Sequence, residues 1–122
     1  MRILVLADDL IWATRLAAHV RTSGAEPVPT RTSAAFRDGL IGADGAIVDL
    51  TSRAYDGLAE IASARAAGLA VLAVGQHDDH ELRRRALAAG ADRVLAYRKL
   101  FDDGPATITR WLTAARPTET TR

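Results

Sequence analysis

The sequence has no cysteine and few aromatic residues, and both shortages restrict what the protein can be. Without cysteine, disulfide bonds, thiolate metal sites and cysteine catalysis are all excluded. Two residues each of Trp, Tyr and Phe leave a core that must be built mainly from small aliphatic side chains. A formal net charge of +1 gives no electrostatic reason to expect binding to nucleic acid or to an anionic membrane.

Long apolar runs are missing as well. Only five apolar residues, Ile3–Ala7, separate Met1 and Arg2 from Asp8, which is too short for a secretory signal or a membrane span. We therefore expect a cytoplasmic protein. The 122 residues suffice for one domain, which we expect over residues 1–116, followed by a flexible tail over residues 117–122.

Apolar runs alternate with helical patterns along the chain. We expect strands at Ile3–Ala7, Glu26–Thr30, Gly45–Leu50, Ala70–Val74 and Arg93–Tyr97. We expect a first helix capped by Asp9 and ended by Gly24, and a third that carries Leu58 to Arg65 and is closed by Gly68. The other helices are expected over 33–40, 81–89 and 105–112. Two prolines in the second strand each remove a backbone donor, which places that strand near an edge. This alternation predicts an α/β fold with a parallel five-stranded sheet and helices on both faces.

Carboxylates stand where two of these strands end. Asp8 and Asp9 follow the first strand, and Asp49 lies at the end of the third. In open parallel sheets, sites form at the carboxyl ends of the strands, where the strand order reverses. The three side chains are therefore expected in one small region, although Asp9 and Asp56 are also well placed to cap helices.

Four stretches carry a family resemblance: ILVLADD at the first strand, VDLTSRAYDGL around Asp49, AVLAV, and ALAAGADRVL. In the second stretch, Asp56-Gly57 follows Asp49 after seven residues. Together they resemble the receiver domains of bacterial two-component response regulators, from the start of the chain to about Leu112. The resemblance implies a flavodoxin-like, doubly wound sheet with strand order 2-1-3-4-5.

The resemblance also implies a site. Asp49 matches the aspartate that accepts a phosphoryl group from a histidine kinase. Asp8, Asp9, Asp49 and the backbone carbonyl of Thr51 match the ligands of a magnesium ion. Carboxylate and carbonyl oxygens are what Mg²⁺ prefers, and the ion would neutralise charge on the transferring phosphoryl group. We expect any such Mg²⁺ binding to be weak, and we expect no other cofactor.

Two positions depart from the family pattern. Gly75 stands where the family has a threonine or serine hydroxyl, and Tyr97 stands where it has a lysine. Arg98 and Lys99 are possible substitutes for that lysine. Along a strand, Arg98 would point to the opposite face and Lys99 would return one pleat too far. The half of the site that senses phosphate is therefore expected to be degenerate.

These departures favour an atypical receiver, or pseudo-receiver, that signals through protein–protein contact with impaired or absent phosphorylation switching. The expected surface is the helix at 81–89, the strand at 93–97 and the helix from Pro105, with a kinase, an effector domain or a second copy as partner. The alternative is Mg²⁺-dependent phosphoryl transfer from a histidine kinase to Asp49. Apart from such self-catalysed transfer, we expect no enzyme activity.

Several aromatic residues allow two interpretations. Tyr97 either donates its hydroxyl to Asp49 or stays partly exposed at a strand end. Trp12 is a candidate for an exposed anchor, whereas Trp111 is expected to pack on the sheet.

Charged runs in the later half of the chain also have two interpretations. His77 and His80 could bind a metal but are better explained as solvated residues near a helix start. Arg83–Arg85 could meet an acidic partner but is better explained as a solvated helix face.

Overall fold

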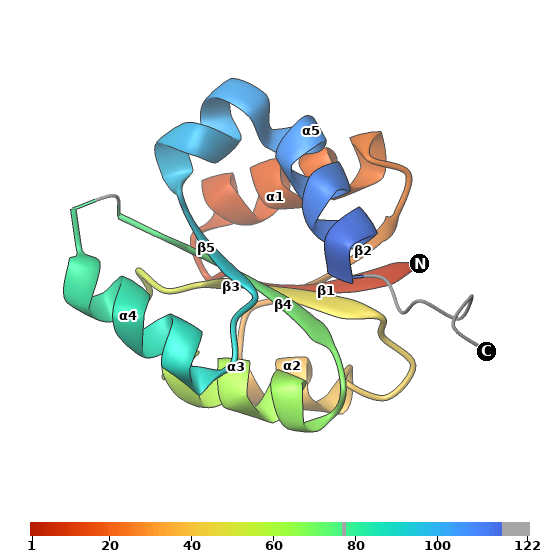
Figure 1. The fold of residues 1–122 in the computed structure, drawn as a ribbon. Helices are drawn as coiled ribbons and strands as arrows, with labels where there is room; N and C mark the ends of the chain where they lie inside the picture. The colour runs from red at the N-terminus through yellow and green to blue at the C-terminus, as the bar shows by residue number, and fades with distance from the viewer. Residues whose placement is uncertain (77, 116–122) are drawn as a thin grey trace.

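A five-stranded parallel sheet divides the helices into two layers (Figure 1). The structure is a computed structural model that describes residues 1–76 and 78–115. The strands are β1 (Arg2–Leu6), β2 (Glu26–Thr30), β3 (Gly45–Asp49), β4 (Ala70–Gly75) and β5 (Arg93–Ala96), in spatial order β2-β1-β3-β4-β5. This order confirms the predicted doubly wound, flavodoxin-like fold.

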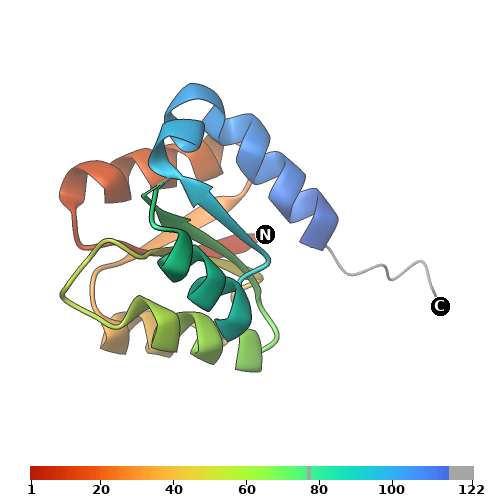
Figure 2. The ribbon, with the colours of Figure 1, turned by 60° about the vertical axis from the view of Figure 1, so that its left-hand side comes forward.

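The helices lie on opposite sides of the sheet, as the turned view in Figure 2 also shows. One layer holds α1 (Leu10–Thr22) and α5 (Tyr97–Ala115), and the other holds α2 (Ser33–Asp38), α3 (Gly57–Ala66) and α4 (His80–Ala89). Within the described residues, no helix combines the length and the apolar character needed to cross a membrane. The tail predicted over 117–122 lies outside the described residues.

Strand residues alternate between two cores, which explains the continuous apolar runs. In β1, Ile3 and Val5 join the core beneath α1 and α5, while Leu4 and Leu6 join the core beneath the other three helices. Both faces of a covered parallel strand are buried, so both sets of positions must be apolar. Trp111 is 1% exposed in the first of these cores, which confirms that it packs on the sheet.

The prolines of β2 are consistent with its place in the sheet. Among the described strands, β2 pairs only with β1, so it is an edge strand of the sheet, as its sequence predicted. A proline nitrogen costs no ladder hydrogen bond where it faces the free edge.

Helix ends follow the local sequence. Asp9 caps α1 by accepting a hydrogen bond from the Trp12 amide at 3.0 Å, and Asp56 caps α3 through the Ala59 amide at 3.2 Å. Both predicted caps are confirmed. α4 ends at Ala89, and its C-cap Gly90 has a φ of +123°, a conformation that side-chain-bearing residues rarely adopt.

The end of β5 differs from the prediction. The predicted strand ran to Tyr97, but β5 stops at Ala96 and Tyr97 begins α5. The helix was expected to start at Pro105, but it already starts at Tyr97. It contains one residue with non-helical backbone angles, Asp103. Pro105 cannot donate to the carbonyl four residues earlier, so the helix is interrupted in the turn before it. Burial of Leu100 in the core beneath α5 accounts for the helical segment that precedes the kink.

An ion pair joins α2 to α3. Glu60 is 1% exposed, and both of its carboxylate oxygens accept hydrogen bonds from Arg37, from Nε and from Nη2, each at 2.9 Å. The fork geometry satisfies a carboxylate that has little access to water. The sequence analysis did not identify this pair.

Removing only one member of the pair should destabilise the fold. In Arg37→Met the buried Glu60 carboxylate loses its partner, so we expect a clear loss of free energy of unfolding in urea denaturation at neutral pH. Adding Glu60→Leu should recover much of that loss, because no buried charge then remains. Arg2→Met is the matched control, since Arg2 and Glu26 form an exposed pair at 4.0 Å. Equal stability of Arg37→Met and the unsubstituted chain would contradict this interpretation.

Candidate functional site

The strand register brings the proposed site residues to one edge of the sheet. Asp49 is the last residue of β3 and pairs with Val74 of β4. Gly75, the next residue of β4, pairs with Ala96 of β5. The strand order reverses between β1 and β3, so the residues after β1 lie beside Asp49 at the switch point.

Asp49 is buried and only half satisfied. It is 1% exposed, and its Oδ1 accepts hydrogen bonds from the Thr51 amide at 2.9 Å and from Thr51 Oγ1 at 2.7 Å. Its Oδ2 is also buried and has no hydrogen-bond partner among the described residues. Nor does any described cation form an ion pair with it. Asp49 therefore has one fixed oxygen and one unpartnered oxygen.

Tyr97 lies above this carboxylate and is held by two contacts. Its hydroxyl lies 3.2 Å from Thr51 Oγ1. The single hydroxyl hydrogen of Thr51 points to Asp49, so Tyr97 is the donor in this pair. Its ring packs against Trp12 of α1, with ring centroids 3.8 Å apart. The structure favours the interpretation in which Tyr97 lies above the acidic site, and the hydroxyl forms its hydrogen bond with Thr51.

Tyr55 also belongs to the site, although the sequence analysis did not single it out. Its buried hydroxyl lies 2.7 Å from the Asp49 carbonyl and 3.1 Å from the Leu6 carbonyl, and its one hydrogen is shared between them. It thereby joins the ends of β3 and β1. One feature of the sequence could have identified Tyr55: it is an aromatic residue directly before Asp56-Gly57, in a loop where few apolar residues are expected.

The pKa values of both tyrosines are raised. Burial is the main cause at each residue. The negative charges of Asp49 and then Asp8 raise the pKa of Tyr55 further, while a hydrogen bond with Ser52 lowers it. At Tyr97, the nearby Asp49 carboxylate raises the pKa further and Thr51 lowers it. Both phenols therefore stay protonated well above the pH at which a free tyrosine ionises.

The acidic pair after β1 has two different environments. Asp9 is exposed and its Oδ1 is engaged in the cap of α1, whereas Asp8 is half-buried. The Asp8 carbonyl accepts a hydrogen bond from Arg31 Nη2 at 3.0 Å, a contact that the sequence analysis did not include. The two neighbouring carboxylates are therefore not equivalent at this edge.

A magnesium site was predicted from Asp8, Asp9, Asp49 and the Thr51 carbonyl. Within residues 1–76 and 78–115, no group of three or more His, Asp or Glu side chains is placed to hold a metal ion. Asp49 Oδ2 has the chemistry of a ligand, but as these side chains lie they do not form the three-carboxylate set. Magnesium binding through these residues stays a prediction.

Gly75 leaves room for a side chain. A Cβ at this position would lie 3.8 Å from the nearest atoms of Leu50, which is ordinary van der Waals contact. The φ of Gly75 is not positive, so the backbone would accept other residues. A small cavity of about 90 Å³ adjoins it, lined in part by Leu50, Leu82 and Leu95. The packing around Gly75 would therefore allow a residue with a hydroxyl group at this position.

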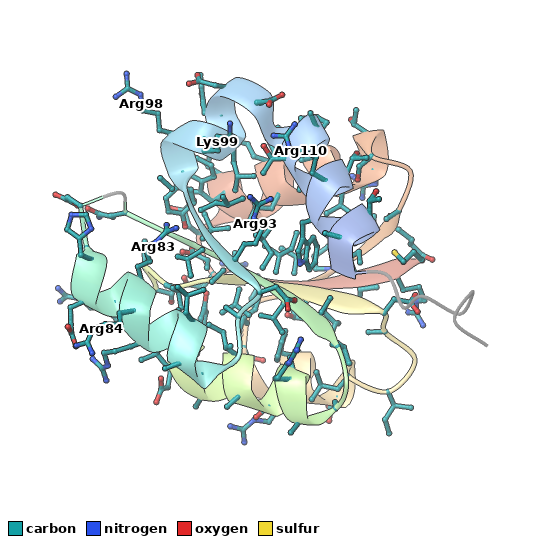
Figure 3. The ribbon with its side chains drawn as sticks, viewed as in Figure 1. Arg83, Arg84, Arg93, Arg98, Lys99 and Arg110 are labelled. Atoms are coloured by element: carbon teal, nitrogen blue, oxygen red, sulfur yellow. The ribbon has the colours of Figure 1, made fainter. Side chains whose placement is uncertain are left out.

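Arg98 and Lys99 lie on the first turn of α5, so the strand geometry expected for them does not apply. Both are exposed, and Arg98 extends away from the molecule in Figure 3. Neither forms an ion pair with any residue that the structure describes. Their use as substitutes for a lysine at the site stays a prediction. Of the proposed histidine pair, His80 is exposed and His77 lies outside the described residues.

Comparison with known proteins gives structural matches only. No family model and no curated protein matches this sequence. Among solved structures, the BeF3-activated DrrB receiver domain has a TM-score of 0.80 at 17% identity, over 92% of this chain and 97% of that one. Full-length FixJ from B. japonicum has a TM-score of 0.78 at 22% identity, over 98% of this chain and 61% of FixJ.

A third match is a response regulator protein from Burkholderia pseudomallei, solved with a phosphorylated aspartic acid, a calcium ion and citrate. Its TM-score is 0.70 at 17% identity, over 95% of this chain and 75% of that one. At these identities the matches establish the fold. The fold of this chain is therefore that of response-regulator receiver domains.

The raised pKa values predict how the protein responds to alkali. Unfolded tyrosine ionises near pH 10, whereas Tyr55 and Tyr97 keep their protons in the folded protein. The unfolded chain then binds fewer protons, so the free energy of unfolding should fall as the pH rises above about 10. Tyrosinate absorbance should appear only together with unfolding.

Tyr55→Phe and Tyr97→Phe should each make this fall with pH less steep. Tyr55→Phe should also cost about 1–3 kcal/mol at neutral pH, because two buried carbonyls lose a donor. Tyrosinate absorbance near pH 10 in the still-folded, unsubstituted protein would contradict the burial of both hydroxyls.

Proposed function

We propose that this chain is an atypical receiver-type signalling module that acts mainly through protein–protein contact, with impaired or absent phosphorylation switching. Its fold supports the receiver-type assignment, and the place of Asp49 supports its correspondence to the phosphoacceptor. In this proposal the module is one domain over residues 1–116 of a cytoplasmic protein, and it neither binds nucleic acid nor acts as an enzyme.

The main support for the proposal is the identity of the residues at the ends of β4 and β5, beside Asp49. Gly75 offers no hydroxyl, and Tyr97 offers a neutral ring where a cation would be needed. A switch requires two states that make different contacts with the phosphoryl group. Each charge-assisted hydrogen bond contributes roughly 1.5–3 kcal/mol. Two missing contacts would therefore remove most of the few kcal/mol that shift such an equilibrium.

The burial of Asp49 is a second support. An attacking carboxylate oxygen must reach the phosphorus atom in line with the leaving group. Asp49 is 1% exposed, and Tyr97 and Thr51 lie against it, so these residues would have to move before a donor could approach. Because the carboxylates do not form a three-ligand set, we propose weak or absent Mg²⁺ binding and assign the metal no step.

The second candidate is a phosphoryl-accepting receiver. In it, Asp49 Oδ2 attacks the phosphorus of a phosphohistidine, the P–N bond breaks, and the imidazole leaves with the electron pair. The unpartnered state of Oδ2 favours this candidate, since that oxygen has no hydrogen bond to give up. The phosphorylated aspartic acid in the Burkholderia pseudomallei protein is a precedent on the same fold.

For the partner surface, we propose α4, β5 and α5, with a histidine kinase, an effector domain or a second copy as the partner. Figure 3 shows Arg83, Arg84, Arg93 and Arg110 distributed over these three elements. Among these, Arg84 is paired with Glu81 and Arg110 with Asp103, while Arg93 forms no ion pair within the described residues. Such a charged surface suits a partner chosen by complementary charge.

The proposal predicts that the protein takes up no phosphate. After incubation with Mg²⁺ and a small acyl phosphate, we expect the intact mass to be unchanged, because the acceptor oxygen is buried and no described Lys or Arg side chain pairs with it. A phosphorylatable receiver domain treated in parallel shows that the donor is active. A gain of one phosphate that disappears in Asp49→Asn would support the second candidate instead.

A paired substitution tests where the defect lies. Gly75→Thr fits without a clash, and Tyr97→Lys replaces the ring by a cation. We expect the double variant to gain a phosphate in the same assay, and Asp49→Asn in that background to abolish the gain. A folded double variant that gains none would show that the defect is not confined to these two positions.

A further inference from the structure

One face of α1 contacts the start of α5, residues 97–102, which we call the cover segment because Tyr97 lies over the acidic site. Trp12 packs on Tyr97 with ring centroids 3.8 Å apart, and the guanidinium carbon of Arg15 lies 5.2 Å from the centre of the Phe101 ring. Residues three or four positions apart share a helix face, so these two contacts lie side by side along α1.

A third contact of this face lies at the kink where the cover segment ends. The imidazole of His19 lies so close to Gly104 that a Cβ at that position would be 2.6 Å from its Cδ2 and Nε2 atoms and 2.7 Å from its Cε1 atom. Only glycine leaves room for the ring here. Gly104 is buried, and it stands between Asp103, whose backbone angles are not helical, and Pro105. The ring therefore packs on the hinge between the two parts of α5.

Burial and charge favour the neutral form of His19. The side chain is half-buried, and burial, followed by the positive charge of Arg15, lowers its pKa. Two carboxylates precede the contact on α5: Asp103 accepts a hydrogen bond from Arg110 at 3.4 Å, and Asp102 is exposed. Within the described residues, neither carboxylate forms an ion pair with His19.

The other elements around α1 add few charges. β1 and β2 contain only Arg2 and Glu26, which lie at the strand starts and pair with each other at 4.0 Å. Arg98 and Lys99 of the cover segment are exposed cations, as is Arg21 of α1 itself. The feature that favours a charged ring is the carbonyl end of α1, since His19 lies in its last turn.

We propose that the His19–Gly104 contact is a proton-operated clamp on the cover segment. While the imidazole is neutral, the ring stays packed on the hinge and Tyr97 stays over the acidic site. When the ring takes a proton from solvent, its charge is poorly solvated against the buried backbone, so the ring turns out to water and frees the hinge. The proposal rests on the function proposed above and adds what controls access to Asp49.

The direction of the response follows from the contact. Of the three α1 residues, only His19 changes its charge between about pH 5 and pH 8. The packed ring binds a proton more weakly than a ring in water, so acid favours the open hinge. The unfolded chain likewise binds more protons than the folded one, and the free energy of unfolding should fall as the pH falls below about 6.5.

The test follows the ¹⁵N-labelled full chain from about pH 7.5 to about pH 5, without Mg²⁺ or a phosphodonor. We expect the imidazole signals of His19 to titrate below about pH 6.5, and the amide signals of Thr51 and residues 97–104 to shift with the same midpoint. Corrected for the intrinsic effect of pH, amide exchange in the cover segment should rise roughly tenfold for each pH unit between that midpoint and the pKa of free histidine. Exchange in α3, on the other face of the sheet, should not follow this midpoint.

Variants of the two contact residues locate the clamp. His19→Gln is polar but uncharged, so its cover segment should not respond over the same pH range. His80→Gln is the matched control, because His80 is exposed on α4, and it should leave the response unchanged. Gly104→Ala should displace the ring and give, at neutral pH, the fast exchange that the unsubstituted chain shows in acid. If Gly104→Ala does not fold, His19→Gln alone decides.

Three results would overturn the proposal. Titration of the His19 ring at or above about pH 6.5 would show that the carbonyl end of α1 or the neighbouring carboxylates outweigh burial. An equal pH response in His19→Gln would assign that response to another group. Cover-segment signals that stay unchanged while His19 titrates would show that the hinge is not coupled to the ring.

The same titration in Asp49→Asn separates this proposal from the function on which it rests. The response of the cover segment should be unchanged there, because Asp49 takes no part in the clamp. Phosphate uptake by the unsubstituted chain at neutral pH would contradict the inactive switch and leave the clamp intact. An absent pH response would remove the clamp and leave the phosphate result as it stands.

Discussion

The burial of the Asp49 carboxylate is the constraint on which the rest of the site depends. A carboxylate removed from water is costly unless hydrogen bonds or opposite charges replace the solvent. Thr51 supplies two hydrogen bonds to one oxygen, and no described residue supplies any to the other. The loop after β3 must therefore hold Thr51 in place. Tyr55 helps to fix that loop, because its hydroxyl binds the Asp49 carbonyl and the end of β1.

The early start of α5 determines what surrounds Tyr97 at this site. Because the chain turns into a helix at Tyr97, the ring lies over Asp49 and packs on Trp12, while Arg98 and Lys99 turn out to solvent. The same turn buries Leu100 and exposes Phe101 beside Arg15. Trp12 thus contributes to the cover of the acidic site through its contact with the Tyr97 ring.

Local patterns in the sequence predicted the parts of the fold that depend on local physics. Continuous apolar runs identified four of the strands. The weaker pattern at Glu26–Thr30 identified β2, and its prolines predicted the edge position. Asp9 and Asp56 were assigned correctly as caps. The start of α5 was missed because Arg93–Tyr97 reads as one apolar strand. Only the burial of Leu100 on the sheet, a tertiary contact, reveals the helix.

The chemistry of the site was less predictable for the same reason. The positions of Asp49, Gly75 and Tyr97 at one edge follow from the strand order. The contacts of Tyr97 with Thr51 and Trp12 join residues 46 or more positions apart and carry no local signal. The Arg37–Glu60 pair was missed likewise, since each residue alone has the appearance of an ordinary exposed helix residue.

A phosphoryl mimic can show whether the buried Asp49 carboxylate is accessible and whether its occupation changes the rest of the fold. Beryllium fluoride can occupy an accessible carboxylate in place of a phosphoryl group, and it can be added with Mg²⁺ to the ¹⁵N-labelled chain. Because Asp49 is buried, we expect the amide signals of Thr51, Gly75 and Tyr97 to stay unchanged. A new set of signals at these residues, spreading into α4 and β5, would contradict it, because Asp49 would then be both reachable and coupled to the fold.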